Sequence, residues 1–193
     1  MPNSNLTMAG QLVTASIITL TLCPLSIRAA TIEPDLLETP AIIARQRLIS
    51  EGISAYQKGY YSSAVYLLRN FLNPHRLIKT PLEKSGINHL ALAYQAIGES
   101  FQATATIERA ISVTSNSPLE LATSEYNAGL IASLQNEQEI ANQHWEIARQ
   151  LYKNQNRDLE WKKTTLQLVQ SHRELGNLPK SRRLLEELKA IKP

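Results

Sequence analysis

Apolar and polar positions alternate with a helical period along residues 40–193, and turn residues interrupt the pattern at regular intervals. Gly, and less often Asn, suits the left-handed backbone position at which helices end. Pro suits the first position of a helix, and Thr or Ser suits the position before it. The pattern therefore predicts four helices of 17 to 19 residues, which begin at Pro40, Pro81, Pro118 and Asp158 and stop at Gly59, Gly98, Asn136 and Gly176.

A second amphipathic stretch follows each stop. These stretches run from Tyr61 to Leu72, Glu99 to Val113, Glu137 to Lys153 and Leu178 to Ile191. The stops recur 38 to 40 residues apart, and self-similarity at such a period is typical of a solenoid. We expect an all-α protein in which residues 40–193 form a row of four antiparallel helix hairpins. Thr80-Pro81-Leu82-Glu83 predicts a capping box, and Ser117-Pro118-Leu119-Glu120 repeats the device.

Small and large residues keep the same register in all four hairpins. Small residues allow two helices to approach closely, and a large residue four places on lies on the same helix face, where it fills the groove to the next hairpin. The small positions are Gly52, Ala91, Gly129 and, less small, Val169 in the first helices, with Ala64, Ala103, Ala141 and Ser181 in the second helices. The large positions are Leu68, Ile107, Trp145 and Leu185.

With this register the four segments resemble tetratricopeptide (TPR) repeats. The resemblance implies a right-handed α-solenoid whose first helices line a concave wall that binds a peptide or helix of another protein. Two departures stand out: the aromatic often found early in the first helix is replaced by Leu48, Ile87, Glu125 and Thr165, and the period exceeds the family's usual length of about 34 residues. Another family of helical-hairpin repeats is the rival interpretation.

The resemblance also implies which side chains face the groove. They are Ile49, Ile53, Tyr56, Asn88, His89, Leu92, Gln95, Tyr126, Asn127, Leu130, Ser133, Leu166, Gln167, Gln170 and Arg173. Chaperone-binding members of the family grip a C-terminal carboxylate with several Lys and Arg. These positions lack the accompanying basic residues, so we expect a segment anchored by apolar side chains, with Asn and Gln available to its backbone.

The N-terminal segment has a different character. It carries no charged side chain before Arg28, and Leu12 to Leu22 is mostly apolar and short for a membrane span. We interpret residues 1–30 as a signal peptide, cut near Ala29 or Ala30, and residues 31–39 as a linker. An uncleaved anchor or transit segment, a lipoprotein signal at Cys23 and a simple tail are the alternatives. An exported protein is expected if the segment is a signal, and a membrane-anchored or cytoplasmic one otherwise.

The remaining chemistry of the sequence points away from enzymes. The four His residues form no paired ligand motif, and neither a Gly-rich phosphate loop nor a nucleophile elbow is present. The net charge of +3 comes with no basic stripe of the kind that nucleic-acid binding requires. We therefore expect no cofactor, no metal and no nucleic acid, and a protein partner instead.

A self-associating assembly protein is the competing hypothesis. Solenoid ends usually need a polar capping element. The last predicted helix carries Leu184, Leu188 and Ile191, and no further helix follows to cover them. End-to-end dimerisation through this face is the alternative to groove binding.

Overall fold

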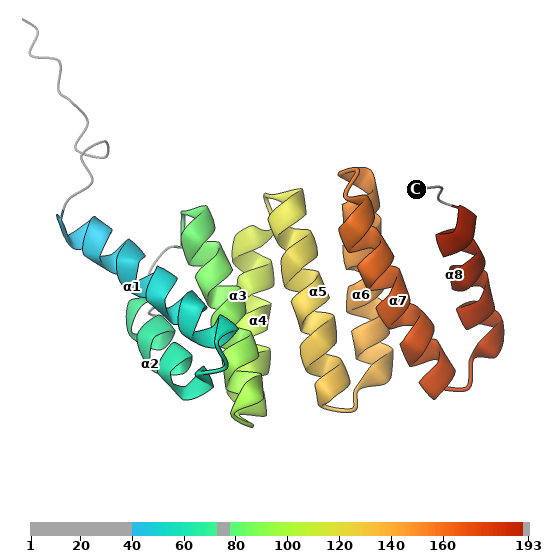
Figure 1. Cartoon of the computed structure of the whole chain (residues 1–193), viewed down its shortest axis with the longest axis horizontal. Coiled ribbons are helices and arrows are strands. Elements are labelled where there is room, and N and C mark those ends of the chain that lie inside the picture. The colour runs from blue at the N-terminus through green and yellow to red at the C-terminus, as the bar shows by residue number, and fades with distance from the viewer. Residues whose placement is uncertain (1–39, 73–77, 191–193) are drawn as a thin grey trace, which may run out of the picture. The chain divides into compact units, whose positions relative to one another are not determined.

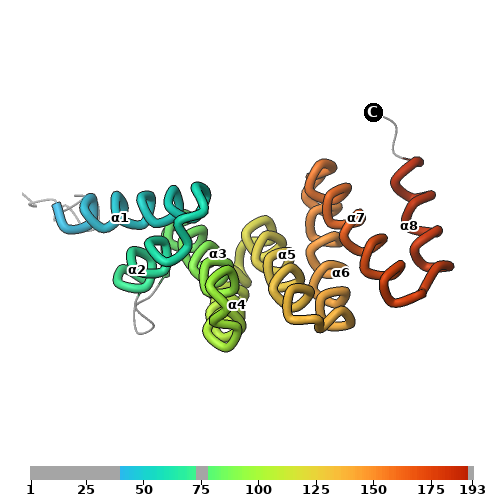
Figure 2. The backbone as a smooth tube through the Cα atoms, turned by 60° about the horizontal axis from the view of Figure 1, so that its bottom comes forward, coloured from blue at the N-terminus to red at the C-terminus, as the bar shows by residue number. Residues whose placement is uncertain are grey.

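The chain divides into two units, residues 1–37 and 38–193, and the computed structural model describes residues 40–72 and 78–190 of the second. These residues form eight α-helices with no strand among them. Consecutive helices pack as neighbours in one row, in the manner of an all-α solenoid (Figures 1 and 2). The helices are α1 (Pro40–Gln57), α2 (Tyr61–Phe71), α3 (Pro81–Ala96), α4 (Ser100–Thr114), α5 (Pro118–Leu134), α6 (Gln138–Asn154), α7 (Asp158–Glu174) and α8 (Leu178–Ala190).

The predicted stops close each hairpin with the same backbone turn. Gly59, Gly98, Asn136 and Gly176 all have positive φ, between 64° and 84°. At the first turn the Tyr60 N–H donates to the Ala55 carbonyl, and equivalent bonds close the other three. The same turn also joins α6 to α7 at Asn156, which has φ 54°; the pattern predicted a break between Lys153 and Asp158 but no left-handed residue in it. The motif satisfies carbonyl groups that a helix end leaves free.

The two predicted capping devices behave differently. Thr80 and Glu83 form a full capping box at α3, and Glu83 also forms a 2.7 Å ion pair with Arg45 of α1. Ser117 precedes α5 but makes no side-chain cap. The prediction of a second capping box is therefore wrong: the Ser117 N–H donates to the Thr114 carbonyl, and the Glu120 carboxylate pairs with Lys84 of α3. Thr39, the cap predicted for α1, lies outside the described residues.

The small positions are where the helices of one hairpin approach most closely. A Cβ placed on Gly129 would lie 2.4 Å from Trp145 Nε1, and one on Gly52 would lie 2.7 Å from Leu68 Cγ. The large residue thus packs first against the small residue of its own hairpin. Leu68 also reaches the next hairpin, where it lies 3.6 Å from the position that a Cβ on Gly86 would take. Filling the groove to the next hairpin, the role predicted for the large residues, is therefore a second role of Leu68.

The last hairpin departs from the predicted register. Leu184 is 1% exposed and belongs to the core, whereas Leu185 and Leu188 are half-buried against the same cluster. Leu184 is therefore already covered by its own hairpin, contrary to the expectation that it needs a dimer partner. Ile191, the third residue of that expectation, lies outside the described residues.

The predicted N-terminal leader and linker, residues 1–39, also lie outside the described part. Among the helices that are described, none combines the length and the apolar character needed to cross a lipid bilayer.

Candidate functional site

A pocket of about 280 Å³ opens between α3 and α5, on the side formed by the first helices. Its walls combine apolar surface with amide and hydroxyl groups. The lining residues are Pro81, Lys84, Ser85, Asn88, His89, Thr114, Leu119, Glu120, Thr123 and Asn127. We call this the α3–α5 pocket.

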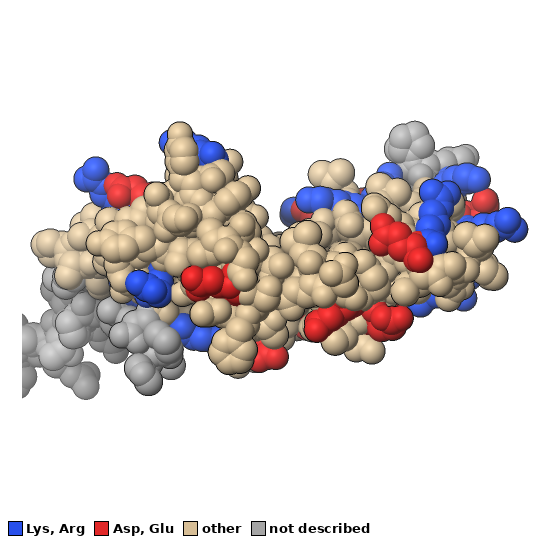
Figure 3. Space-filling view, turned by 90° about the horizontal axis from the view of Figure 1, so that it is seen from below, with Lys and Arg blue, Asp and Glu red and all other residues tan. Residues whose placement is uncertain are grey.

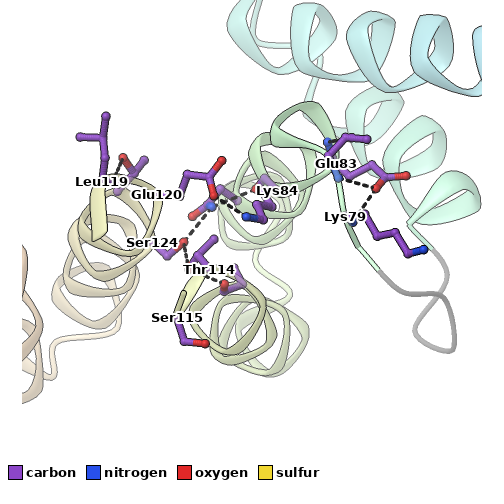
Figure 4. Close-up of polar contacts among 12 residues, drawn as sticks. Lys79, Glu83, Lys84, Thr114, Ser115, Leu119, Glu120 and Ser124 are labelled. Carbon is purple, nitrogen blue, oxygen red and sulfur yellow. Dashed lines mark hydrogen bonds and ion pairs between the residues drawn. The ribbon is translucent and has the colours of Figure 1, made fainter. Parts of the chain in front are cut away.

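A buried hydrogen-bond network forms the floor of the α3–α5 pocket. Asn127 Nδ2 donates to Asn88 Oδ1 at 3.0 Å, and Asn88 Nδ2 donates to Ser124 Oγ at 3.0 Å. Thr114 at the end of α4 donates to the same Ser124 oxygen at 3.1 Å (Figure 4). Asn88 and Ser124 are 4% and 0% exposed, so the network fixes the side-chain amides in place.

An ion pair spans the same pocket. Lys84 Nζ on α3 donates to Glu120 Oε2 on α5 at 2.5 Å, and both side chains are half-buried (Figure 4). The pair neutralises both charges, because each is held against the other in a partly dehydrated site. The α3–α5 pocket therefore offers a ligand neutral hydrogen-bonding groups and apolar walls rather than a net charge.

A second pocket, of about 270 Å³, continues the first toward α7. It is lined by Thr123, Tyr126, Asn127, Tyr152, Glu160, Lys163 and Thr164. Thr123 and Asn127 line both pockets. The two pockets therefore adjoin at α5, with one toward α3 and the other toward α7, and we call the two together the first-helix groove.

Aromatic side chains shape the α5–α7 end of the first-helix groove. Lys163 Nζ lies 5.2 Å from the Tyr126 ring centre, a cation–π distance. Tyr152 OH donates to Thr123 Oγ1 at 3.3 Å. Burial, and then the neighbouring Tyr152, raises the pKa of Tyr126, so its hydroxyl stays protonated at neutral pH. The polar groups of this end are therefore the Lys163 ammonium, the Glu160 carboxylate, the Asn127 amide and several hydroxyl groups.

Four of the residues predicted for the groove line it: Asn88, His89, Tyr126 and Asn127. Tyr56 lies beside them, with its ring centre 5.3 Å from that of His89. Asn88, Tyr126 and Asn127 are at least 91% buried, so they form the floor rather than the rim.

Other predicted groove residues lie elsewhere. Ile49 is wrong as a groove residue: it is fully buried in the core beside the close approach of α1 and α3 at Gly86, and cannot contact a partner. Gln95 and Ser133 are half-buried and bonded to Gln135 and Gln138. The remaining predicted positions line neither pocket; Ile53, Leu92, Leu130 and Gln167 are half-buried, and Leu166, Gln170 and Arg173 are exposed.

The sequence reasoning missed the charged residues of the groove. Lys84 lies one helical turn before Asn88, and Lys163 lies one turn before Gln167. Residues four apart share a helix face, so the same spacing that identified the amides also indicated these lysines. The prediction that this wall lacks basic residues is therefore wrong, although Lys84 already forms an ion pair with Glu120.

Among the described residues no group of three or more His, Cys, Asp or Glu side chains is arranged to hold a metal ion. Comparison of the sequence with known protein-family models and with curated proteins gave no match.

Proposed function

We propose that this chain is a non-enzymatic scaffold whose first-helix groove binds an extended or helical segment of another protein. The continuity of the two pockets through Thr123 and Asn127 carries the proposal. A groove that crosses three consecutive first helices suits a linear partner segment better than a compact small molecule. The resemblance of the repeats to the TPR family supports the same reading.

The amide of Asn127 gives the groove a way to hold a peptide backbone. Asn127 donates one N–H to Asn88, and its Oδ1 and second N–H have no partner among the described residues. An amide side chain with one free donor and one free acceptor matches the N–H and C=O of a peptide group. Because Asn88 fixes the amide plane, little conformational entropy is lost when a peptide binds there.

Thr123 offers the sharpest test, because it is exposed and lines both pockets. The full chain is captured from cells that produce it, its partner is identified by mass, and the affinity is measured with both proteins purified. We expect Thr123→Arg to weaken that binding at least tenfold by filling the groove. Ser112→Arg, an exposed change on α4 away from the groove, is the matched control and leaves the affinity unchanged.

Circular dichroism of both variants shows whether the helices are intact. A folded Thr123→Arg protein that binds the partner as tightly as the wild type excludes the first-helix groove as the binding surface.

A further inference from the structure

A second groove lies on the opposite helices of the same hairpins. A pocket of about 160 Å³ opens between α4 and α6, over α5. Its floor is apolar: Ile107 and Ile131 are 4% and 2% exposed, and Ala128 and Ala132 lie beside them. We call this the second-helix groove. It shares no lining residue with the first-helix groove.

Apolar side chains also extend the second-helix groove onto its exposed edges. Ile140 on α6 lines it and is 44% exposed. Phe101 on α4 is 83% exposed and lies three and seven residues before Thr104 and Glu108, which both line the groove. Residues at these spacings share one helix face, so Phe101 lies on the side of α4 that faces the groove, beyond the residues that line it. Exposed apolar surface in contact with an apolar groove is typical of interaction sites.

The rim of the second-helix groove is acidic. Glu108 and Glu137 line it, are exposed, and form no ion pair with any described residue. The imidazole of His144, which also lines it, is held by Glu125 at 2.7 Å. The groove thus presents two exposed carboxylates without an ion-pair partner among the described residues beside a buried apolar floor, which suits a segment that carries both basic and apolar side chains.

Acidic and basic residues are also distributed unevenly along the sequence, and acidic residues predominate in the part that forms the second-helix groove. Residues 85–148 contain seven acidic residues and one basic residue, Arg109, whereas residues 149–193 contain eleven basic and five acidic residues. In the view from below, several red groups lie near the lower edge in the middle of the row, and blue groups lie above them and toward both ends (Figure 3). Glu120 and Glu146 are paired with Lys84 and Arg149, so the excess negative charge of this region comes from the remaining carboxylates, among them Glu108 and Glu137.

We infer that the second-helix groove binds a basic amphipathic segment of another protein, with an apolar side chain on the isoleucine floor and Lys or Arg beside Glu108 and Glu137. Charge complementarity selects the partner and the apolar floor anchors it. This site differs from the first-helix groove, so one scaffold would engage two segments at once.

The test is a selection of displayed 14-residue helix-forming peptides on the purified full chain. The wild-type pool is expected to be enriched at least fivefold in peptides with Lys or Arg flanking large apolar residues. In Glu108→Lys/Glu137→Lys that enrichment disappears and acidic peptides replace the basic ones. Glu51→Lys/Glu186→Lys changes two exposed carboxylates of α1 and α8 by the same total charge and keeps the wild-type preference.

The contribution of the apolar floor is measured on one selected basic peptide by fluorescence anisotropy. Ile140→Ser is expected to weaken its binding several-fold, whereas Leu178→Ser, the same kind of change at an exposed residue of α8 that lines neither groove, leaves it unchanged. The inference is overturned if the wild-type pool shows no basic preference or if that preference survives the Glu108→Lys/Glu137→Lys change. It is equally overturned if no peptide is selected and the same change abolishes self-association in sedimentation, because the occupant is then a second copy of this chain.

Discussion

The two hydrophobic clusters of the solenoid are filled by different kinds of side chain. The cluster of α1 to α4, to which Ala128 and Ile131 of α5 also belong, is mainly aliphatic, with Ile49, Leu68 and Ile87 fully buried. The cluster of α5 to α8 is built around Trp145 and Trp161, with Tyr126 and Tyr152 beside them. Both clusters lie between helix hairpins of the same arrangement. The repeat therefore determines where a large side chain lies but not whether that side chain is aliphatic or aromatic.

Buried polar groups follow the same division. In the first half, Glu83 is held by two backbone N–H groups and by Arg45. In the second half, Glu125 and Thr165 occupy two positions where TPR repeats often carry an aromatic, and they are bonded to His144 and Arg149. The buried side-chain atoms that have no partner among the described residues all lie on α6 and α7, at Asn142, Trp161 and His172. Among the described residues, the half formed by α5 to α8 is therefore the one in which more buried polar atoms lack a hydrogen-bond partner.

The largest expected difference between the halves comes from the two central large residues. Trp145→Ala is expected to cost about 3–5 kcal/mol and Leu68→Ala about 2–5 kcal/mol. Trp145 ranks higher because it also donates a 3.2 Å hydrogen bond to the Tyr126 carbonyl. Urea unfolding followed by circular dichroism measures both. A Leu68→Ala protein less stable than Trp145→Ala contradicts this ranking.

The two central glycines give the next largest effect. Gly129→Ala is expected to cost about 1–3 kcal/mol, because the added methyl meets the rigid Trp145 ring. Gly52→Ala is expected to cost less, since Leu68 can change rotamer and alanine favours a helix by about 1 kcal/mol. In Gly129→Ala/Trp145→Ile, which reproduces the Ala91–Ile107 pair of the second hairpin, the steric part of the loss should disappear in a double-mutant cycle. Additive losses in that cycle refute the steric explanation.

The halves are also expected to lose stability in different pH ranges. Burial, and then the charges of Lys180 and Arg183, lowers the pKa of His172 below 6.5, against an opposing effect of Glu146. The unfolded chain binds a proton first, so this contribution is complete above pH 6.5 and is lost as the pH falls below it. Burial by itself raises the pKa of Glu83, but backbone hydrogen bonds at Thr80 and Lys79 and the charge of Arg45 bring it below 4.5. Its contribution is complete above pH 4.5 and is lost at lower pH.

Thermal unfolding from pH 3 to 8 tests both assignments. His172→Phe is expected to remove the decrease in melting temperature that begins near pH 6.5 and to leave the acid decrease. Glu83→Gln is expected to do the reverse. Unchanged pH profiles in both variants show that other groups govern the pH dependence.

The smallest expected effects lie in the turns, where the first half uses Gly59 and Gly98 and the second half uses Asn136, Asn156 and Gly176. Asn136→Gly is expected to stabilise the protein by about 0.5 kcal/mol, because glycine adopts positive φ without a Cβ penalty. Gly98→Asn is expected to cost a similar amount. Melting temperatures that move in the opposite directions contradict this account of the turns.

The helix boundaries were predictable because they depend on local chemistry. All four first helices begin at the predicted residue, and their stops have positive φ. At Asn156 the sequence pattern predicted only a break between Lys153 and Asp158, and the left-handed turn that fills it was not predicted. The missing capping box at Ser117 reflects other bonds of its two members: the Ser117 N–H donates to the Thr114 carbonyl, and the Glu120 carboxylate pairs with Lys84, 36 residues away.

The groove was predictable only in part. Periodicity placed Asn88 and Asn127 on the correct faces, because side-chain direction follows from helix geometry. It failed at Ile49, where the close approach of α1 and α3 at Gly86 turns a groove position into core. It gave no sign of the second-helix groove, since neither α4 nor α6 shows from its own sequence which of its faces remains uncovered.

The sequence by itself determined the eight helices, the turns at the four predicted stops and most positions of small and large residues, because each depends on residues within one or two helical turns. The tertiary structure alone decided which polar groups meet: Asn88 with Asn127, Lys84 with Glu120 and Glu125 with His144. It also decided which apolar faces stay open between neighbouring hairpins. These depend on the spacing and angle between hairpins, which arise from the fit of many side chains at once and which no local pattern encodes.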